Sequence, residues 1–208
     1  MYHYYLFHKP FGCVTARRDE RYPTVMDWFR ELDNPDLSPV GRLDRETEGL
    51  LLFTDDGRLD AALLSPDARV EKTYFFRAAG DLPPHAEEEI ARGIPLTREG
   101  TLSAPAVLTV TGRCTLGDLV PHLPPREAAY CLRRAKRPAT EGTLTVTEGK
   151  WHEVRRILGY FGLSVLSLCR TEFGPITLGD LPPCELRPLS EEETAKLYLR
   201  AGIDRPQS

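Results

Sequence analysis

Residues 41–54 read GRLDRETEGLLLFT and join a charged loop to an apolar run. Asp44 lies between two arginines, and the apolar residues 50–53 follow directly after the loop. A short apolar run that ends at the turn signal Asp-Asp-Gly predicts a buried strand. The segment therefore predicts a loop that carries charge and leads straight into the hydrophobic core.

Strand and helix patterns are intermixed along the rest of the chain. β-branched and aromatic stretches predict strands, and apolar residues at helical spacing predict helices. The expected strands are residues 4–8, 50–54, 70–78, 106–111, 143–147 and 163–169. The expected helices are residues 25–32, 58–64, 84–94, an amphipathic helix with its apolar stripe at Trp151, Val154, Ile157, Leu158 and Phe161, and a last helix capped at Ser190. This order lacks a steady βαβ alternation and predicts an α+β fold with a mixed, largely antiparallel central sheet flanked by helices.

Length and composition limit the class of protein. A chain of 208 residues with 41% hydrophobic residues is expected to form one domain, residues 1–208, which could have two lobes. No apolar stretch approaches the roughly 20 residues of a membrane helix, and the N-terminus has no signal-peptide pattern. The five cysteines include no C-x-x-C pair that would suggest a metal site. We therefore expect a soluble cytoplasmic protein without a bound metal.

Charge is distributed unevenly along this acidic chain. The net charge of -4 argues mildly against a nucleic-acid partner, because phosphate binding depends on clustered lysine and arginine. Residues 131–156, however, contain seven basic and three acidic side chains, a local charge of +4. Such asymmetry permits a basic face that binds a polyanion, and a solvated run of charges is the alternative. Residues 112–140, rich in proline and arginine, are expected to be irregular.

Asp44 is the first candidate for chemistry. A carboxylate beside cations should have a pKa below about 3.9, so it would be ionised at neutral pH and could serve as a nucleophile or base. A purely structural charge cluster is the alternative interpretation. Glu46 and Glu48 could pair with Asp44 as the two carboxylates of a glycosidase, although acids close in sequence need not face one sugar. Lys9 is interpreted as a phosphate contact or a surface residue beside a turn.

Four motifs occur in order along the chain: HKPFG at residues 8–12, GRLDRETEGLLLFTDDG at 41–57, EKTY at 71–74 and EGKWHEVRRIL at 148–158. Together they resemble the RNA pseudouridine synthases, specifically the branch that modifies single uridines in small-subunit or large-subunit ribosomal RNA. The likeness extends from about residue 4 to about residue 189. It implies the pseudouridine synthase catalytic fold and the isomerisation of a specific uridine to pseudouridine without any cofactor.

The resemblance also implies roles for four side chains. Asp44 corresponds to the catalytic nucleophile or base, and Arg155 to the cation that pairs with it. Tyr74 corresponds to the residue that packs against the target base, and Arg42 to the side chain that enters the RNA stack when the uridine leaves it. The implied partner is ribosomal RNA or a ribosomal particle, bound by a monomer, with no membrane and no small-molecule cofactor.

Two departures from the family pattern affect substrate recognition. Family members commonly carry an N-terminal S4-type RNA-binding module, and HKPFG at residue 8 leaves no room for one. Either residues 133–137 of the catalytic domain are expected to help recruit RNA, or this chain has been trimmed. Glu153 stands where glutamine is usual and is expected to add a negative charge next to Arg155. The alternatives are a glycosidase-like hydrolase that uses Asp44 with Glu46 or Glu48, and a non-catalytic RNA-binding or ribosome-assembly protein.

Overall fold

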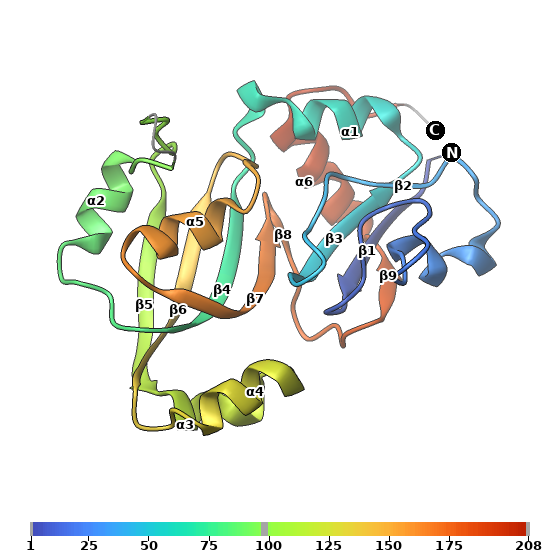
Figure 1. Ribbon diagram of the computed structural model, residues 1–208. Helices are drawn as coiled ribbons and strands as arrows, with labels where there is room; N and C mark the ends of the chain where they lie inside the picture. Colours follow the sequence, from blue (N-terminus) through green and yellow to red (C-terminus); the bar gives the residue numbers. More distant parts are fainter. Residues whose placement is uncertain (1, 97–99, 207–208) are drawn as a thin grey trace. The chain divides into compact units, whose positions relative to one another are not determined.

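The computed structural model describes residues 2–96 and 100–206, which fold as two compact units (Figure 1). Unit 1 combines Met1–Lys72 with Arg170–Ser208, and unit 2 is Thr73–Cys169. Each unit contains strands and helices, and the strand pairs described below are antiparallel. The expected α+β class with largely antiparallel strands is confirmed. Among the described residues, no helix has the length and apolar character needed to cross a membrane.

Unit 1 is built around the strand that follows the Asp44 loop. Its strands are β1 (Tyr4–Lys9), β2 (Ser38–Pro39), β3 (Glu48–Thr54), β8 (Ile176–Thr177) and β9 (Leu186–Pro188). Strand β1 pairs with β3 on one side and with β9 on the other, and Tyr4 lies opposite Thr54. Its helices are α1 (Gly57–Leu64), α6 (Glu191–Ala201) and the 3₁₀-helices η1 (Val25–Trp28), η2 (Arg30–Leu32) and η3 (Pro66–Ala68). Both termini of the chain are thus tied to β3 through β1 and β9.

Aromatic rings fill the core of unit 1. The rings of Phe29 and Phe53 stack with centroids 3.9 Å apart, and Phe7 contacts both of them. Such aromatic pairs stabilise the fold by more than the burial of their apolar surface alone. Phe29 separates η1 from η2, so the expected helix at residues 25–32 is instead two short 3₁₀-helices. A capping box begins η1, in which the N–H of Thr24 donates to the carboxylate of Asp27 at 2.8 Å.

Unit 2 is a sheet with helices that share its core. Its strands follow the order β5 (Val107–Thr115), β6 (Pro138–Val146), β4 (Lys72–Ala79) and β7 (Ser164–Phe173), and the ends of β4 and β7 reach into unit 1. Helices α2 (Ala86–Arg92) and α5 (Glu153–Tyr160) contribute Ile90, Ile157 and Leu158 to the same buried cluster as these strands. The core thereby holds α5, which carries Arg155.

The expectation of an irregular segment at residues 112–140 is wrong. Strand β5 continues to Thr115 and is followed by α3 (Leu116–Leu119), the 3₁₀-helix η4 (Val120–His122) and α4 (Pro125–Leu132), after which β6 begins. Proline occupies the first turn of both η4 and α4. Proline is favourable at this position because its fixed φ suits the first turn and the missing N–H would have no helical partner there. The prolines therefore start helices in this segment.

Asp56 joins four elements of unit 1. One carboxylate oxygen accepts hydrogen bonds from the N–H groups of Arg58 and Leu59 and so caps α1. The other accepts a hydrogen bond from the hydroxyl of Tyr198, whose oxygen lies 2.8 Å from that of Tyr4. Because Asp56 follows β3 directly, this network fixes the end of β3 against β1, α1 and α6.

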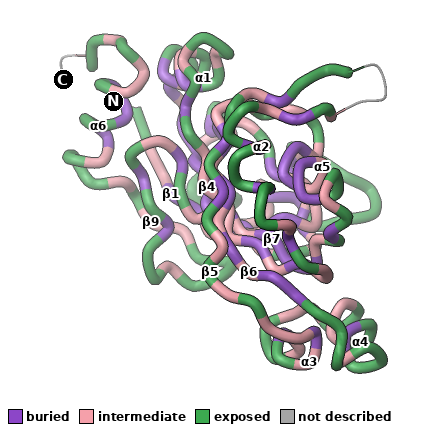
Figure 2. The backbone as a smooth tube through the Cα atoms, turned by 90° about the vertical axis from the view of Figure 1, so that its left-hand side faces the viewer, coloured by how far each residue is buried: buried purple, intermediate pink, exposed green. Residues whose placement is uncertain are grey.

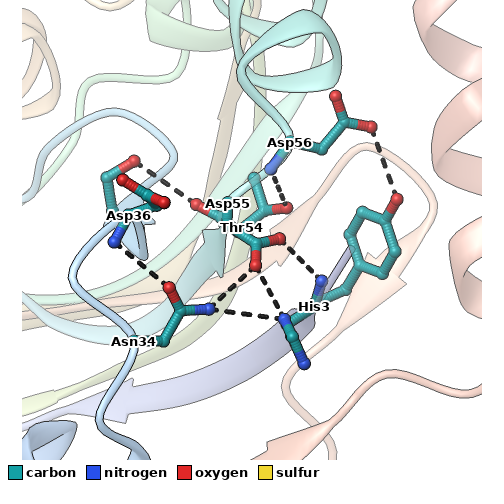
Figure 3. Close-up of polar contacts among 8 residues, drawn as sticks. His3, Asn34, Asp36, Thr54, Asp55 and Asp56 are labelled. Atoms are coloured by element: carbon teal, nitrogen blue, oxygen red, sulfur yellow. Dashed lines mark hydrogen bonds and ion pairs between the residues drawn. The ribbon is translucent and has the colours of Figure 1, made fainter. Parts of the chain in front are cut away.

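Asp55 ties the N-terminus and a loop to the same end of β3 (Figure 3). Its carboxylate accepts a hydrogen bond of 2.7 Å from the N–H of His3 and one of 2.8 Å from the amide of Asn34, and the His3 ring nitrogen lies 2.7 Å away. Burial acts to raise the pKa of Asp55, but these hydrogen bonds outweigh it and lower the pKa overall. The ionised carboxylate is therefore part of the folded structure.

We predict that Asp55→Asn lowers the free energy of unfolding at pH 7 by about 1–3 kcal/mol, the cost of weakening several hydrogen bonds to one charged group. Because the folded pKa lies below the ordinary value of 3.8, the contribution is complete above about pH 4 and is lost as the pH falls through the folded pKa. Urea unfolding of both proteins between pH 7 and pH 2.5 measures this. A difference that stays constant down to pH 2.5 contradicts the assignment.

Candidate active site

The Asp44 loop, residues 41–47, connects β2 to β3 in unit 1. Leu43 is 6% exposed, whereas Arg42 is exposed and Asp44 is half-buried. The buried hydroxyl of Thr15 donates to the carbonyl of Leu43 at 2.8 Å and accepts from its N–H at 3.2 Å. Both backbone groups of the residue before Asp44 are therefore held by one side chain.

Lys9 holds the other side of the Asp44 loop. Its side chain is fully buried, and its ammonium donates to the carbonyls of Thr47 at 2.8 Å and Arg45 at 3.4 Å. The N–H of Gly12 also donates to the backbone carbonyl of Arg45. The N–H of Thr47 donates to the backbone carbonyl of Asp44 at 3.0 Å, which closes a tight turn. The interpretation of Lys9 as a surface residue or phosphate contact is wrong, because the ammonium is occupied inside the protein.

The ammonium of Lys9 has a shifted pKa. Burial lowers it to about 8, and the nearby negative charges of Glu48 and Asp44 oppose this effect. Lysine is seldom fully buried unless it is paired. At neutral pH Lys9 is therefore mostly protonated, and it is a cation near Asp44 that the sequence analysis did not identify. The signal for it was the HKPFG motif, in which the lysine ends β1 just before a turn.

A second buried cation, on β7, bonds to the strand that follows the loop. Arg170 is 2% exposed, and its Nε donates to the carbonyl of Leu50 in β3 at 2.8 Å. Its guanidinium also lies over the ring of Phe173 at 5.2 Å. The positive charge of Arg170 acts to lower the pKa of Lys9. Sequence reasoning also missed this residue, because a lone arginine within a strand usually indicates an exposed position.

The nearest carboxylate after Asp44, Glu46, has a partner of its own. Arg45 forms an ion pair with Glu46 at 3.1 Å, and its guanidinium lies 4.3 Å from the ring centre of Tyr22. Glu48 begins β3. A glycosidase needs a second carboxylate that faces the sugar from across the scissile bond. The ion pair of Glu46 gives no support to that role.

Tyr74 lies in unit 2 on β4, where it is half-buried and packs against the main core cluster of that unit. The neighbouring Thr73 contacts Thr145 of unit 2 through their hydroxyl oxygens, 3.0 Å apart. A tyrosine fixed in a strand keeps its ring orientation, because both side-chain torsions are restricted by packing. Tyr74 is therefore a rigid aromatic surface of the kind that can support a nucleobase.

Arg155 lies on α5 in unit 2. The apolar residues Val154, Ile157 and Leu158 are buried as predicted, which fixes the rotation of this helix about its axis. Arg155 is half-buried, and its Nη1 donates to the carbonyl of Val165 at 3.2 Å. Part of its guanidinium is thus anchored within unit 2.

The N-terminus of α5 corrects one prediction. Trp151 was expected on the apolar stripe but is 73% exposed, because α5 begins only at Glu153. His152 before it has a left-handed backbone with φ of 51°, and its ring stacks on Trp151 with centroids 4.0 Å apart. The backbone change at His152 turns Trp151 away from the core.

Glu153 is 6% exposed and carries a perturbed charge. Burial, followed by a hydrogen bond with Glu148, raises the pKa of Glu153 to about 7. Glu148 is lowered in pKa instead: burial would raise it, but the N–H of Ala104 and the ammonium of Lys150 stabilise its charge. Burial thus favours the neutral form of Glu153 and reduces the negative charge that was expected next to Arg155.

The four predicted site residues divide evenly between the units: Arg42 and Asp44 belong to unit 1, and Tyr74 and Arg155 to unit 2. Their roles remain predictions. Within the part of the chain that the structure describes, no group of three or more His, Cys, Asp or Glu side chains is arranged to hold a metal ion.

Comparison with known proteins matches the chain to one family. The family model described as RNA pseudouridylate synthase matches residues 3–159. The ribosomal small subunit pseudouridine synthase A of Pseudomonas aeruginosa is 37% identical over 191 residues, which are 91% of this chain and 72% of the relative. The protein of the same name from Escherichia coli is 35% identical over 195 residues, 93% and 73% of the two chains.

Solved structures of pseudouridylate synthases also resemble this chain. A crystal structure of a pseudouridylate synthase superposes with a TM-score of 0.76 at 30% identity, over 95% of this chain and 74% of that one. The human RNA pseudouridylate synthase domain containing 1 superposes with a TM-score of 0.58 at 16% identity and shares the fold. The chain therefore belongs to the RNA pseudouridine synthase family and is an isomerase of that family.

Proposed function

We propose that this enzyme converts one specific uridine of small-subunit ribosomal RNA to pseudouridine and that Asp44 is the reacting carboxylate. The two bacterial relatives described above are named for this subunit. The observation that carries the proposal is the double anchoring of the Asp44 loop by Thr15 on one side and Lys9 on the other. Such preorganisation is what a group in covalent chemistry needs, because a displacement of about 1 Å can cost a hundredfold in rate.

The reaction rearranges the uridine without adding or removing atoms. The bond between N1 and the ribose C1′ breaks, a bond between C5 and C1′ forms, the C5 proton leaves and N1 gains a proton. Asp44 either attacks C1′ or removes the C2′ proton to give a glycal, and both routes need the ionised carboxylate. The balance requires neither an oxidant nor an energy source, so the proposal includes no small-molecule cofactor.

Three further side chains support this chemistry in the proposal. The exposed Arg42 fills the gap in the RNA when the uridine leaves its stack, and Tyr74 packs against the extruded base. These contacts offset the few kcal/mol that extrusion costs. Arg155 supplies positive charge to keep Asp44 ionised.

We also propose that the enzyme acts as a cytoplasmic monomer on ribosomal RNA or on an assembling ribosomal particle. One chain supplies all four of the proposed residues, so the chemistry needs no second copy. The raised pKa of Glu153 fits this scheme, because a neutral Glu153 does not offset the positive charge of Arg155 on the same helix.

We predict that Asp44→Asn abolishes pseudouridine formation, by about 10⁴-fold or more, because the reacting carboxylate is lost while the size of the side chain is kept. Carbodiimide-dependent reverse-transcription stops on ribosomal RNA that lacks pseudouridine measure this. Glu46→Gln is the matched control from the same loop and should retain activity within about tenfold.

Three results would contradict this proposal. Equal modification by the wild-type protein and Asp44→Asn would remove Asp44 from the chemistry. Release of free uracil, with a lighter RNA product, would favour the glycosidase alternative. A wild-type protein that binds RNA but modifies no uridine would favour the non-catalytic alternative.

We predict that Arg155→Leu lowers kcat by about a hundredfold with little change in the unfolding temperature, because the charge serves the reaction more than the fold. Arg156→Leu on the same helix is the matched control, since Arg156 donates to the carbonyl of Leu96 and has no proposed catalytic role. Arg155→Lys should recover part of the loss. Gross unfolding of Arg155→Leu, or an equal loss of kcat in Arg156→Leu, would assign Arg155 a structural role instead.

We predict that Lys9→Met lowers both stability and turnover. The substitution removes the ammonium that donates to the carbonyls of Pro10 and Thr47, while the Arg45 carbonyl keeps the N–H of Gly12. It should cost about 2–4 kcal/mol of unfolding free energy. At a temperature where the variant is still folded, kcat should fall at least about tenfold through the misplaced Asp44, with KM for RNA nearly unchanged. The exposed Lys196→Met is the control. A stability loss with normal kcat would show that Lys9 supports only the fold.

A further inference from the structure

The segment between β5 and β6 forms a small folded module. We define the basic module as residues 116–137, which contain α3, η4 and α4. Figures 1 and 2 show these helices beyond the ends of β5 and β6, and most of the α4 region is exposed. A separate buried cluster lies beneath it, formed by Leu116, Leu119, Cys131, Ala139 and Leu166. The module is therefore packed onto β6 and β7 through Ala139 and Leu166.

Backbone contacts hold the arginine-rich end of the basic module in place. The N–H of Leu116 donates to the carbonyl of Arg137 at 2.9 Å, and the N–H of Gly117 donates to that of Ala135 at 3.0 Å. A Cβ on Gly117 would lie 3.2 Å from the Cβ of Ala135, so the two backbones approach closely. The N–H of Arg134 donates to the carbonyl of Cys131 at 2.9 Å. Residues 133–137 are thus a defined turn whose side chains project from a fixed backbone.

The surface of the basic module carries concentrated positive charge. Five of its side chains are basic and exposed: Arg126, Arg133, Arg134, Lys136 and Arg137. Asp118 and Glu127 are its acidic residues, and the Asp118 carboxylate is occupied by the hydroxyl and N–H of Thr115. The module therefore has a formal charge of +3 on a chain whose net charge is -4.

These cations differ from three other arginines of unit 2. Arg77, Arg92 and Arg113 each form an ion pair with a carboxylate of the same unit. Among residues 2–96 and 100–206, none of the five cations of the basic module does so. A folded surface that keeps five cations without carboxylate partners is suited to bind a polyanion, because each phosphate contact releases condensed counterions.

An aromatic side chain within the basic module favours RNA over other polyanions. The guanidinium of Arg134 lies 4.3 Å from the ring centre of Tyr130, which is 39% exposed. Leu132 beside them is 63% exposed. Arginine planes and aromatic rings stack on unpaired bases, and the surrounding cations bind the phosphates. A membrane surface would need a larger apolar face than one leucine and one tyrosine.

We propose that the basic module binds the ribosomal RNA substrate outside the modified uridine, with Arg133, Arg134, Lys136 and Arg137 on phosphates and Tyr130 against an unpaired base. This inference rests on the proposed function for the identity of the RNA. The module raises the affinity for the substrate and takes no part in the chemistry.

The test compares two variants that each lose four positive charges. The module variant is Arg133→Gln, Arg134→Gln, Lys136→Gln and Arg137→Gln. The control variant is Arg58→Gln, Arg92→Gln, Lys196→Gln and Arg205→Gln, whose positions are exposed or form surface ion pairs of little energetic value. Equilibrium binding to small-subunit ribosomal RNA at several salt concentrations gives Kd and its salt dependence.

The module variant should bind RNA at least about tenfold more weakly near 0.15 M salt. The slope of log Kd against log salt should fall by about three, since each single-strand phosphate contact contributes about 0.7. Its kcat at saturating RNA should stay within about twofold of the wild type, because only affinity is changed. The control variant should match the wild type in Kd and slope.

Unchanged binding by the module variant, or equal weakening in both variants, would overturn the proposal, because net charge alone would then explain the result. Unchanged RNA binding with lost binding to phosphatidylserine vesicles would assign the surface to membranes instead. If the module variant unfolds, the pair Arg133→Gln and Arg137→Gln should give half the change in slope. A wild-type protein that makes no pseudouridine yet loses RNA affinity in the module variant would refute the proposed function and leave this inference standing.

Discussion

The buried ammonium of Lys9 is the interaction on which the Asp44 loop depends. Three carbonyls, those of Pro10, Arg45 and Thr47, accept its hydrogen bonds inside the protein. A loop folded this tightly turns carbonyl groups inward, and unpaired buried carbonyls are costly. One flexible side chain at the end of β1 satisfies them and places a positive charge near Asp44. The cost is desolvation of a lysine, which appears as a pKa of about 8.

The residues proposed for catalysis and for RNA binding are distributed over the two units. In unit 1, Lys9 and Thr15 hold the Asp44 loop, and β3 pairs with β1, which in turn pairs with β9. Unit 2 carries Tyr74 and Arg155 on rigid elements, together with the basic module at the ends of β5 and β6. Chemistry is thus assigned to a clamped loop and recognition to a sheet with exposed cationic and aromatic side chains. Sites on rigid elements are positioned more accurately than sites on loops, which is why the Asp44 loop needs buried side chains to hold it.

Sequence patterns predicted the elements that bury apolar residues at a regular period. The strand at residues 50–54, the helix at 58–64 and the stripe of Val154, Ile157 and Leu158 were all identified in this way. The helices of residues 116–132 were missed because a proline-rich composition does not distinguish a loop from helices that begin with proline. Lys9 and Arg170 were misplaced or missed because burial of a cation depends on contacts distant in sequence. Trp151 was misplaced because the left-handed backbone of His152 delays the start of α5 to Glu153. The roles of Arg42, Asp44, Tyr74 and Arg155 came from the family resemblance, since local charge alone left a structural interpretation of Asp44 open.

The most direct test of the account is the distance between Asp44 and the target ribose. A crystal structure of the protein with a small-subunit ribosomal RNA fragment that contains the modified position would measure it. The account predicts a carboxylate oxygen of Asp44 about 3–3.5 Å from C1′ or from the C2′ hydrogen-bearing carbon of an extruded uridine. An extruded uridine whose ribose faces Glu46 or Glu48, with Asp44 more than about 6 Å away and beyond the reach of a bridging water, would contradict it.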